Sequence, residues 1–104
     1  MNELHKQISA LIDSSSGDLE EIERTLTDGY AHVLELEAEK WRLEKRIAEV
    51  AQGLQRGDTA QKVQELSTVA RRVDRNTGDL AELRSLLADL RRHAEAVRLE
   101  AALR

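Results

Sequence analysis

The chain has 104 residues, of which 35% are charged, and its net charge is −4. It contains neither cysteine nor proline, which excludes a disulfide framework, a thiolate metal site and a cysteine nucleophile. The abundance of alanine, leucine, glutamate and arginine is typical of long helices and coiled coils and excludes a fold built on strands.

The charge is divided unevenly between the two halves of the chain. Residues 1–57 carry seven Lys/Arg against twelve Asp/Glu, whereas residues 58–104 carry nine against eight. Nucleic-acid binding requires clustered cations, so we do not expect a nucleic-acid partner. The N-terminus lacks a secretory pattern and no stretch approaches the roughly 20 apolar residues of a membrane span, which predicts a cytoplasmic protein without a membrane partner.

Residues 1–16 predict a short N-terminal helix followed by a Ser-rich hinge. Leu4, Ile8, Leu11 and Ile12 fall on one side of a helix over residues 1–12. The stretch 13–18 then favours a break because Asp, Ser and Gly prefer caps and turns, although a continuous helix through the serines fits the spacing as well. This segment has no partner in the remainder of the predicted fold, so it must fold back, stay loose or pair with another molecule.

Residues 18–56 predict a long helix, capped at its start by Ser16 or Asp18. Its apolar positions recur at alternating steps of three and four residues, which keeps one stripe on one side of a helix. The stripe contains Leu19, Ile22, Leu26, Gly29, Val33, Leu36, Lys40, Leu43, Ile47, Val50 and Leu54.

Residues 59–102 predict a second long helix after the turn at Gly57. Its stripe contains Val63, Leu66, Ala70, Val73, Thr77, Leu80, Leu83, Leu87, Leu90, Ala94, Val97 and Ala101. Thr77, Leu80 and Leu83 are separated by three and three, which indicates a register slip. Two alternatives remain for residues 76–79: a helix that passes through with local overwinding, or a break at Gly78 with a restart capped by Asp79.

The two stripes match when the chain is folded antiparallel about Gly57. Residues whose numbers add to 116 or 117 then face each other, so that Gly29 meets Leu87 and Lys40 meets Thr77 in a polar layer. The predicted fold class is therefore all-α: an antiparallel coiled-coil hairpin over residues 17–104 with a short N-terminal helix, dimerising into a helical bundle. Within it, Lys40 is expected to lay its stem over the seam and reach Asp74 or a nearby glutamate.

A second stripe on the outer flank of the first long helix predicts an interface. A two-helix hairpin covers one stripe only, and this second stripe carries the two aromatic residues of the chain. Self-association into a homodimer would bury it, while packing by the N-terminal segment and stacking of a ligand are the alternatives. The predicted interface residues are Tyr30, Leu34, Ala38, Trp41 and Ala48.

Ligand and metal sites are weakly indicated. His32 and His93 each follow an aspartate by four residues, but metal binding requires three or four converging ligands, so we expect no metal and no cofactor. The densest basic cluster, Arg71, Arg72 and Arg75, is a candidate site for phosphate or a cyclic nucleotide, with ion pairs to glutamates across the hairpin as the plainer interpretation. We expect no enzymatic activity and no catalytic residues, because neither a phosphate loop nor a catalytic triad is present.

These patterns predict a non-enzymatic coiled-coil scaffold or adaptor that mediates protein–protein interaction and self-association. One alternative is a ligand-responsive regulator of the anti-sigma or nucleotide-binding kind, acting through the arginine cluster. Another is a helical chaperone for a secretion or motility component.

Overall fold

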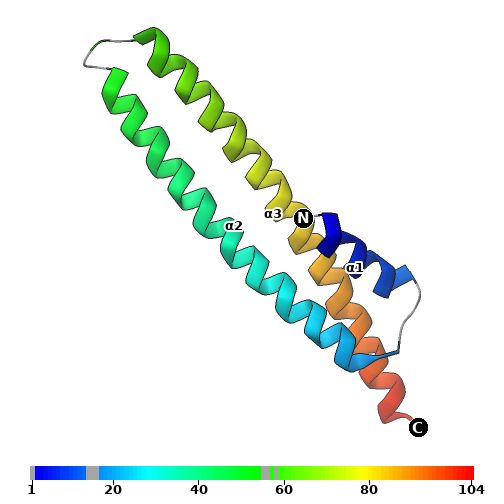
Figure 1. The fold of residues 1–104 in the computed structure, drawn as a ribbon. Coiled ribbons are helices and arrows are strands. Elements are labelled where there is room, and N and C mark those ends of the chain that lie inside the picture. The colour runs from blue at the N-terminus through cyan, green and yellow to red at the C-terminus, as the bar shows by residue number, and fades with distance from the viewer. Residues whose placement is uncertain (1, 14–16, 55–56, 58) are drawn as a thin grey trace. The chain divides into compact units, whose positions relative to one another are not determined.

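A computed structural model describes residues 2–13, 17–54, 57 and 59–104 of the chain. It contains three α-helices, α1 (Asn2–Asp13), α2 (Leu19–Leu54) and α3 (Thr59–Ala102), and no strand among those residues (Figure 1). The predicted all-helical class is confirmed. The Ser-rich hinge at 14–16 lies outside the described residues, so the predicted domain boundary beside it stays a prediction.

Asp18 caps the N-terminus of α2. Its Oδ1 accepts a hydrogen bond of 3.2 Å from the backbone N–H of Glu21, and its carbonyl accepts one of 3.0 Å from Ile22. The first N–H groups of a helix have no partner within the helix, and this carboxylate satisfies one of them. Its negative charge also interacts favourably with the positive end of the helix dipole. Of the two predicted caps, Asp18 is the one observed, and Ser16 is outside the described residues.

The helices form two compact units. Unit 1 contains residues 1–34 and 81–104, and unit 2 contains residues 35–80. Each unit therefore combines one part of α2 with one part of α3, and α1 belongs to unit 1.

In unit 1, α2 and α3 pack antiparallel around aliphatic side chains. Gly29 lies directly against Leu87, as the predicted pairing requires, and Arg98 Nη2 donates to Glu23 Oε1 at 2.6 Å nearer the start of α2. The core of the unit is fully or almost fully buried, and it includes Ile22, Leu83, Leu87, Leu90 and Ala94.

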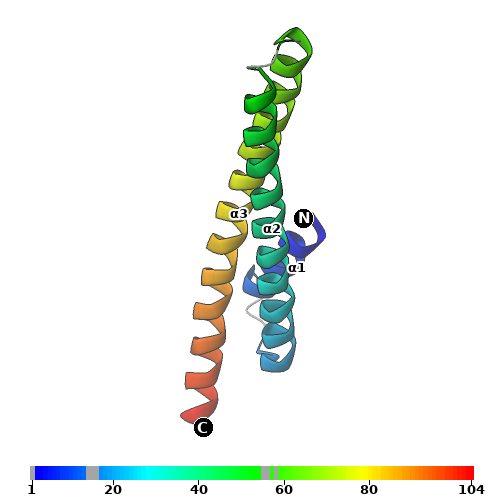
Figure 2. The same cartoon turned by 90° about the vertical axis from the view of Figure 1, so that its left-hand side faces the viewer.

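Helix α1 folds back onto unit 1 (Figures 1 and 2). Its Ile8 is completely buried and its Leu11 nearly so. His5 Nδ1 lies 3.5 Å from Glu82 Oε1 of α3, while Leu11 shares a hollow with residues of α2. Because a 12-residue helix is marginally stable alone in water, burial of this apolar side is what holds α1 in helical form. Of the three possibilities for the N-terminal segment, which were folding back, staying loose and pairing with another molecule, the helix α1 shows the first.

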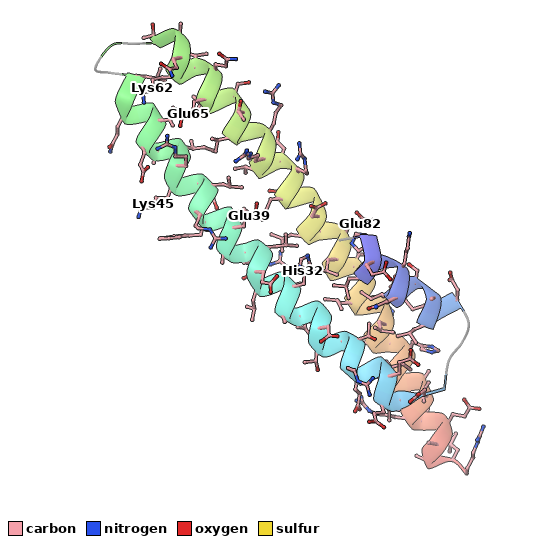
Figure 3. All side chains as sticks on the ribbon, viewed as in Figure 1. His32, Glu39, Lys45, Lys62, Glu65 and Glu82 are labelled. Carbon is pink, nitrogen blue, oxygen red and sulfur yellow. The ribbon has the colours of Figure 1, made fainter. Side chains whose placement is uncertain are left out.

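In unit 2, α2 and α3 also run antiparallel. Asn76 Nδ2 donates to the Leu36 carbonyl at 3.0 Å, and Arg46 of α2 forms an ion pair with Glu65 of α3 nearer the connection between the helices. Figure 3 shows Glu65 on the side of α3 that faces α2. In that connection Gly57 has φ +105°, a left-handed conformation that glycine adopts without steric cost.

The predicted register of α3 is wrong at four positions. Val69 and Asn76 are buried and Lys62 is half-buried against Gly53 of α2, whereas the predicted core residues are exposed at Val63, Ala70, Thr77 and Ala101. With Lys62, Val69 and Asn76 in place of Val63, Ala70 and Thr77, the steps alternate between four and three without interruption, so the slip does not exist and α3 continues through Gly78 as a helix. The corrected stripe is Lys62, Leu66, Val69, Val73, Asn76, Leu80, Leu83, Leu87, Leu90, Ala94 and Val97.

The cause of this error is the polar residue in the core. A buried amide costs free energy unless it is hydrogen-bonded, and the Leu36 carbonyl supplies an acceptor for Asn76 Nδ2. Asn76 therefore takes the core position where the apolar pattern favours Thr77. Lys40, opposite Asn76 in this register, is half-buried, and none of the ion pairs among the described residues involves it; the expected pair with Asp74 is not formed.

Candidate functional site

The predicted interface residues are all exposed on α2. Leu34 is 67% exposed, Trp41 65% and Tyr30 39%, and Ala38 and Ala48 are also exposed. Tyr30 and Leu34 belong to unit 1, and the other three belong to unit 2. The described part of α1 does not cover Tyr30 or Leu34, which leaves these side chains open to solvent in their own unit.

Tyr30 is tied to α3 rather than free. Arg91 Nε donates a hydrogen bond of 3.1 Å to the tyrosine hydroxyl, and Arg91 Nη2 donates to the same oxygen. The guanidinium carbon also lies 5.7 Å from the centroid of the ring, within range of a cation–π interaction. The aromatic ring therefore links the two helices of unit 1, so that Tyr30 is a structural contact as well as a predicted interface residue.

Trp41 is the largest apolar side chain that unit 2 leaves open. Lys45 Nζ, which comes from the next turn of the same helix, lies 5.5 Å from the centroid of its ring. Figure 3 shows Lys45 on the side of α2 that faces away from α3. A tryptophan that is mostly exposed retains apolar surface whose burial would contribute on the order of 3 kcal/mol.

Trp41 belongs to a regular stripe of positions on α2. Ala38, Trp41, Lys45 and Ala48 follow one another at steps of three, four and three, and all four are exposed. This spacing keeps them on one side of the helix for several turns. We call these four residues the Trp41 face.

The predicted arginine site has no excess of positive charge. Arg72 and Arg75 line one hollow of about 170 Å³, whereas Arg71 is exposed and does not line it. Glu39 and Asp79 line the same hollow. A phosphate placed there would meet two carboxylates as well as two guanidinium groups, so the hollow offers little net attraction for an anion.

A larger hollow in unit 1, about 490 Å³, lies beside α1 and also combines opposite charges. One cationic side chain, Arg24, and two anionic side chains, Glu21 and Asp28, line it. The buried Thr25 lines it as well. Within the part of the chain that the structure describes, no three His, Asp or Glu side chains come together as metal ligands. The hollow therefore provides no set of converging donors for a cation.

Arg46 has a structural role in unit 2. It forms ion pairs with Glu65 of α3 and with Glu49 one turn along α2, the latter at 3.3 Å. The hydrogen bond to Glu65 raises the pKa of Arg46 above its usual value, with the charge of Glu65 as the second cause. Arg46 therefore stays cationic at every pH at which the protein is folded, so deprotonation of this guanidinium does not weaken the contact between α2 and α3.

Comparisons with protein-family models, with curated proteins and with solved structures find no match for this chain. Function is therefore inferred from the chemistry of the described surfaces. Among the described residues, no helix has the length and apolar character required to cross a membrane. Sequence reasoning found Trp41 but missed Arg91, Lys45 and Asn76, whose roles depend on how the helices are rotated against each other.

Proposed function

We propose that this chain is a non-enzymatic scaffold or adaptor whose long helices form a coiled-coil hairpin and which binds protein partners, including a second copy of itself. The observation that carries this proposal is the exposure of Trp41, 65%, on a side of α2 where Ala38, Lys45 and Ala48 are exposed as well. Tryptophan is among the side chains most enriched at the energetic centres of protein interfaces. The alternating spacing of the buried positions in both long helices supports the coiled-coil part.

The distribution of charge supports self-association through unit 2. Residues 35–80 carry nine Lys/Arg and nine Asp/Glu, whereas the remainder of the chain carries seven and eleven. Two copies of a neutral unit approach each other without net repulsion, whereas two copies of unit 1 would bring together two net charges of −4. A composition without cysteine agrees with the proposed cytoplasmic location.

Replacing Trp41 by glutamate is expected to convert a dimer into a monomer. The substitution would place a charge where apolar surface is buried between the copies, while Trp41 itself contributes little to the core of its own unit. Sedimentation velocity at micromolar concentration measures the mass, and circular dichroism measures the helix content. We expect halved mass with unchanged helicity.

Leu103→Glu is the matched control, because Leu103 is 79% exposed just after the end of α3 and lies outside the Trp41 face. It should leave the dimer intact. A wild-type chain that sediments as a monomer, or a dimer that survives Trp41→Glu, would contradict self-association through this surface. Loss of helicity in Trp41→Glu would instead identify Trp41 as part of the intramolecular core.

A further inference from the structure

The Trp41 face has an asymmetric composition that specifies the direction of a partner helix. Along α2 it presents Ala38, Trp41, Lys45 and Ala48 in that order, so one aromatic ring and one cation lie between two small side chains. Lys45 Nζ reaches to 5.5 Å from the Trp41 ring centroid within one chain, which shows that a lysine on this face can approach an indole.

We propose that the occupant of the Trp41 face is the same face of a second copy, in antiparallel orientation. This rests on the proposed self-association and adds its geometry. In a parallel dimer Lys45 would face Lys45 of the second copy, which places two like charges in the contact. In the antiparallel dimer Trp41 faces Lys45 of the second copy, and the reverse, so that both cations meet an aromatic ring.

The small residues fit the same antiparallel register. When Trp41 faces Lys45 of the second copy, Ala38 faces Ala48 of the second copy at both ends of the contact, because the paired residues are equally far from the centre. Alanine leaves room for two helix backbones to approach closely, and the bulk of the two tryptophans then fills the middle.

The charges that flank the face form like and unlike pairs in both orientations, so we base the orientation on Lys45 within the face. In the antiparallel pair Arg42 approaches Arg42 of the second copy, with Glu49 of that copy farther along the same flank, and on the other flank Glu44 approaches Glu44 of the second copy. In the parallel pair Glu37 approaches Arg42, whereas Glu44 approaches Glu49. Each orientation thus combines like and unlike charges at its rim. Unit 2 carries no net charge, so no long-range repulsion opposes the contact.

Disulfide trapping tests the orientation directly, because the full chain contains no cysteine of its own. Two single variants, Ala38→Cys and Ala48→Cys, are prepared, one of them with a mass tag, and are oxidised separately and as a mixture. Cysteines bridge only when their Cα atoms lie within about 7 Å. In the antiparallel dimer position 38 of one copy faces position 48 of the other, while position 38 of the two copies is separated by about 15 Å along the axis.

We therefore expect a disulfide-linked heterodimer in the mixture and no disulfide-linked species when either variant is oxidised alone. A control mixture of Ala38→Cys with Ala60→Cys, which is exposed on α3 of unit 2, should give no bridge. A disulfide formed by Ala38→Cys alone or by Ala48→Cys alone would overturn the proposal. The absence of any disulfide in a chain that still sediments as a dimer would also overturn the proposed orientation. That result would not contradict self-association itself.

Discussion

Gly29→Ala is expected to lower the free energy of unfolding by about 1 kcal/mol, although alanine is the better helix former. A Cβ at this position would overlap Leu87 Cδ2 and lie 3.2 Å from Leu87 Cγ. Leu87 is itself buried in the core of unit 1, so its side chain has no free space into which to turn. Overpacking of about 1–3 kcal/mol then exceeds the gain of about 1 kcal/mol in helix propensity.

Gly78→Ala is the matched control. Gly78 also lies within a helix, but it is exposed and a Cβ there meets nothing within 4 Å. The same substitution should raise the free energy of unfolding by about 0.5–1 kcal/mol, because glycine in a helix loses more backbone entropy on folding. Urea unfolding followed by circular dichroism measures both. Two changes of the same sign would show that α2 and α3 do not approach closely at Gly29.

Asn76→Leu is expected to raise the free energy of unfolding by about 1–2 kcal/mol. Asn76 is only 4% exposed, and its Oδ1 has no hydrogen-bond partner. Leucine removes that unsatisfied oxygen and adds apolar surface to the seam, and the neighbouring hollow of about 170 Å³ provides room for its larger volume. The lost hydrogen bond to the Leu36 carbonyl costs little, because that carbonyl belongs to the interior of α2 and keeps its helical partner.

Thr77→Leu separates the two registers of α3. Thr77 is exposed, so leucine there should change the free energy of unfolding by less than about 0.5 kcal/mol. In the register expected from the apolar pattern, Thr77 would be the core position and Thr77→Leu the stabilising change. Thermal unfolding of the two variants side by side decides between them: stabilisation by Thr77→Leu and not by Asn76→Leu would contradict the observed packing.

The seam of α2 could be predicted because its positions repeat at alternating steps of three and four residues, with Lys40 as the one charged member. Gly29 was placed opposite Leu87 on spacing alone, and the two residues are in contact. The register of α3 could not be predicted between Val69 and Thr77, because the core there contains an asparagine that is made tolerable by one specific carbonyl of α2. A pattern of apolar residues does not reveal such a tertiary hydrogen bond.

The candidate site could be predicted in part. Trp41 is apolar but does not occupy a seam position of α2. Its exposure can therefore be predicted from the spacing alone, without knowledge of side-chain contacts. The hydrogen bond between Tyr30 and Arg91 joins residues far apart in the sequence, and it depends on the rotation of both helices. Lys45 belongs to the same stripe as Trp41, but because it is charged, the apolar pattern does not include it. Lys45 is the residue on which the proposed orientation of the partner helix depends.

Fluorescence of Trp41 tests the central claim most directly, because Trp41 is the sole tryptophan and its emission reports on the proposed contact alone. The wild-type chain is diluted from high micromolar to nanomolar concentration while its emission maximum and its quenching by acrylamide are recorded. Association through the Trp41 face predicts a blue-shifted, protected tryptophan at high concentration and a red-shifted, readily quenched one on dilution. An emission maximum and a quenching constant typical of exposed tryptophan at every concentration would contradict it.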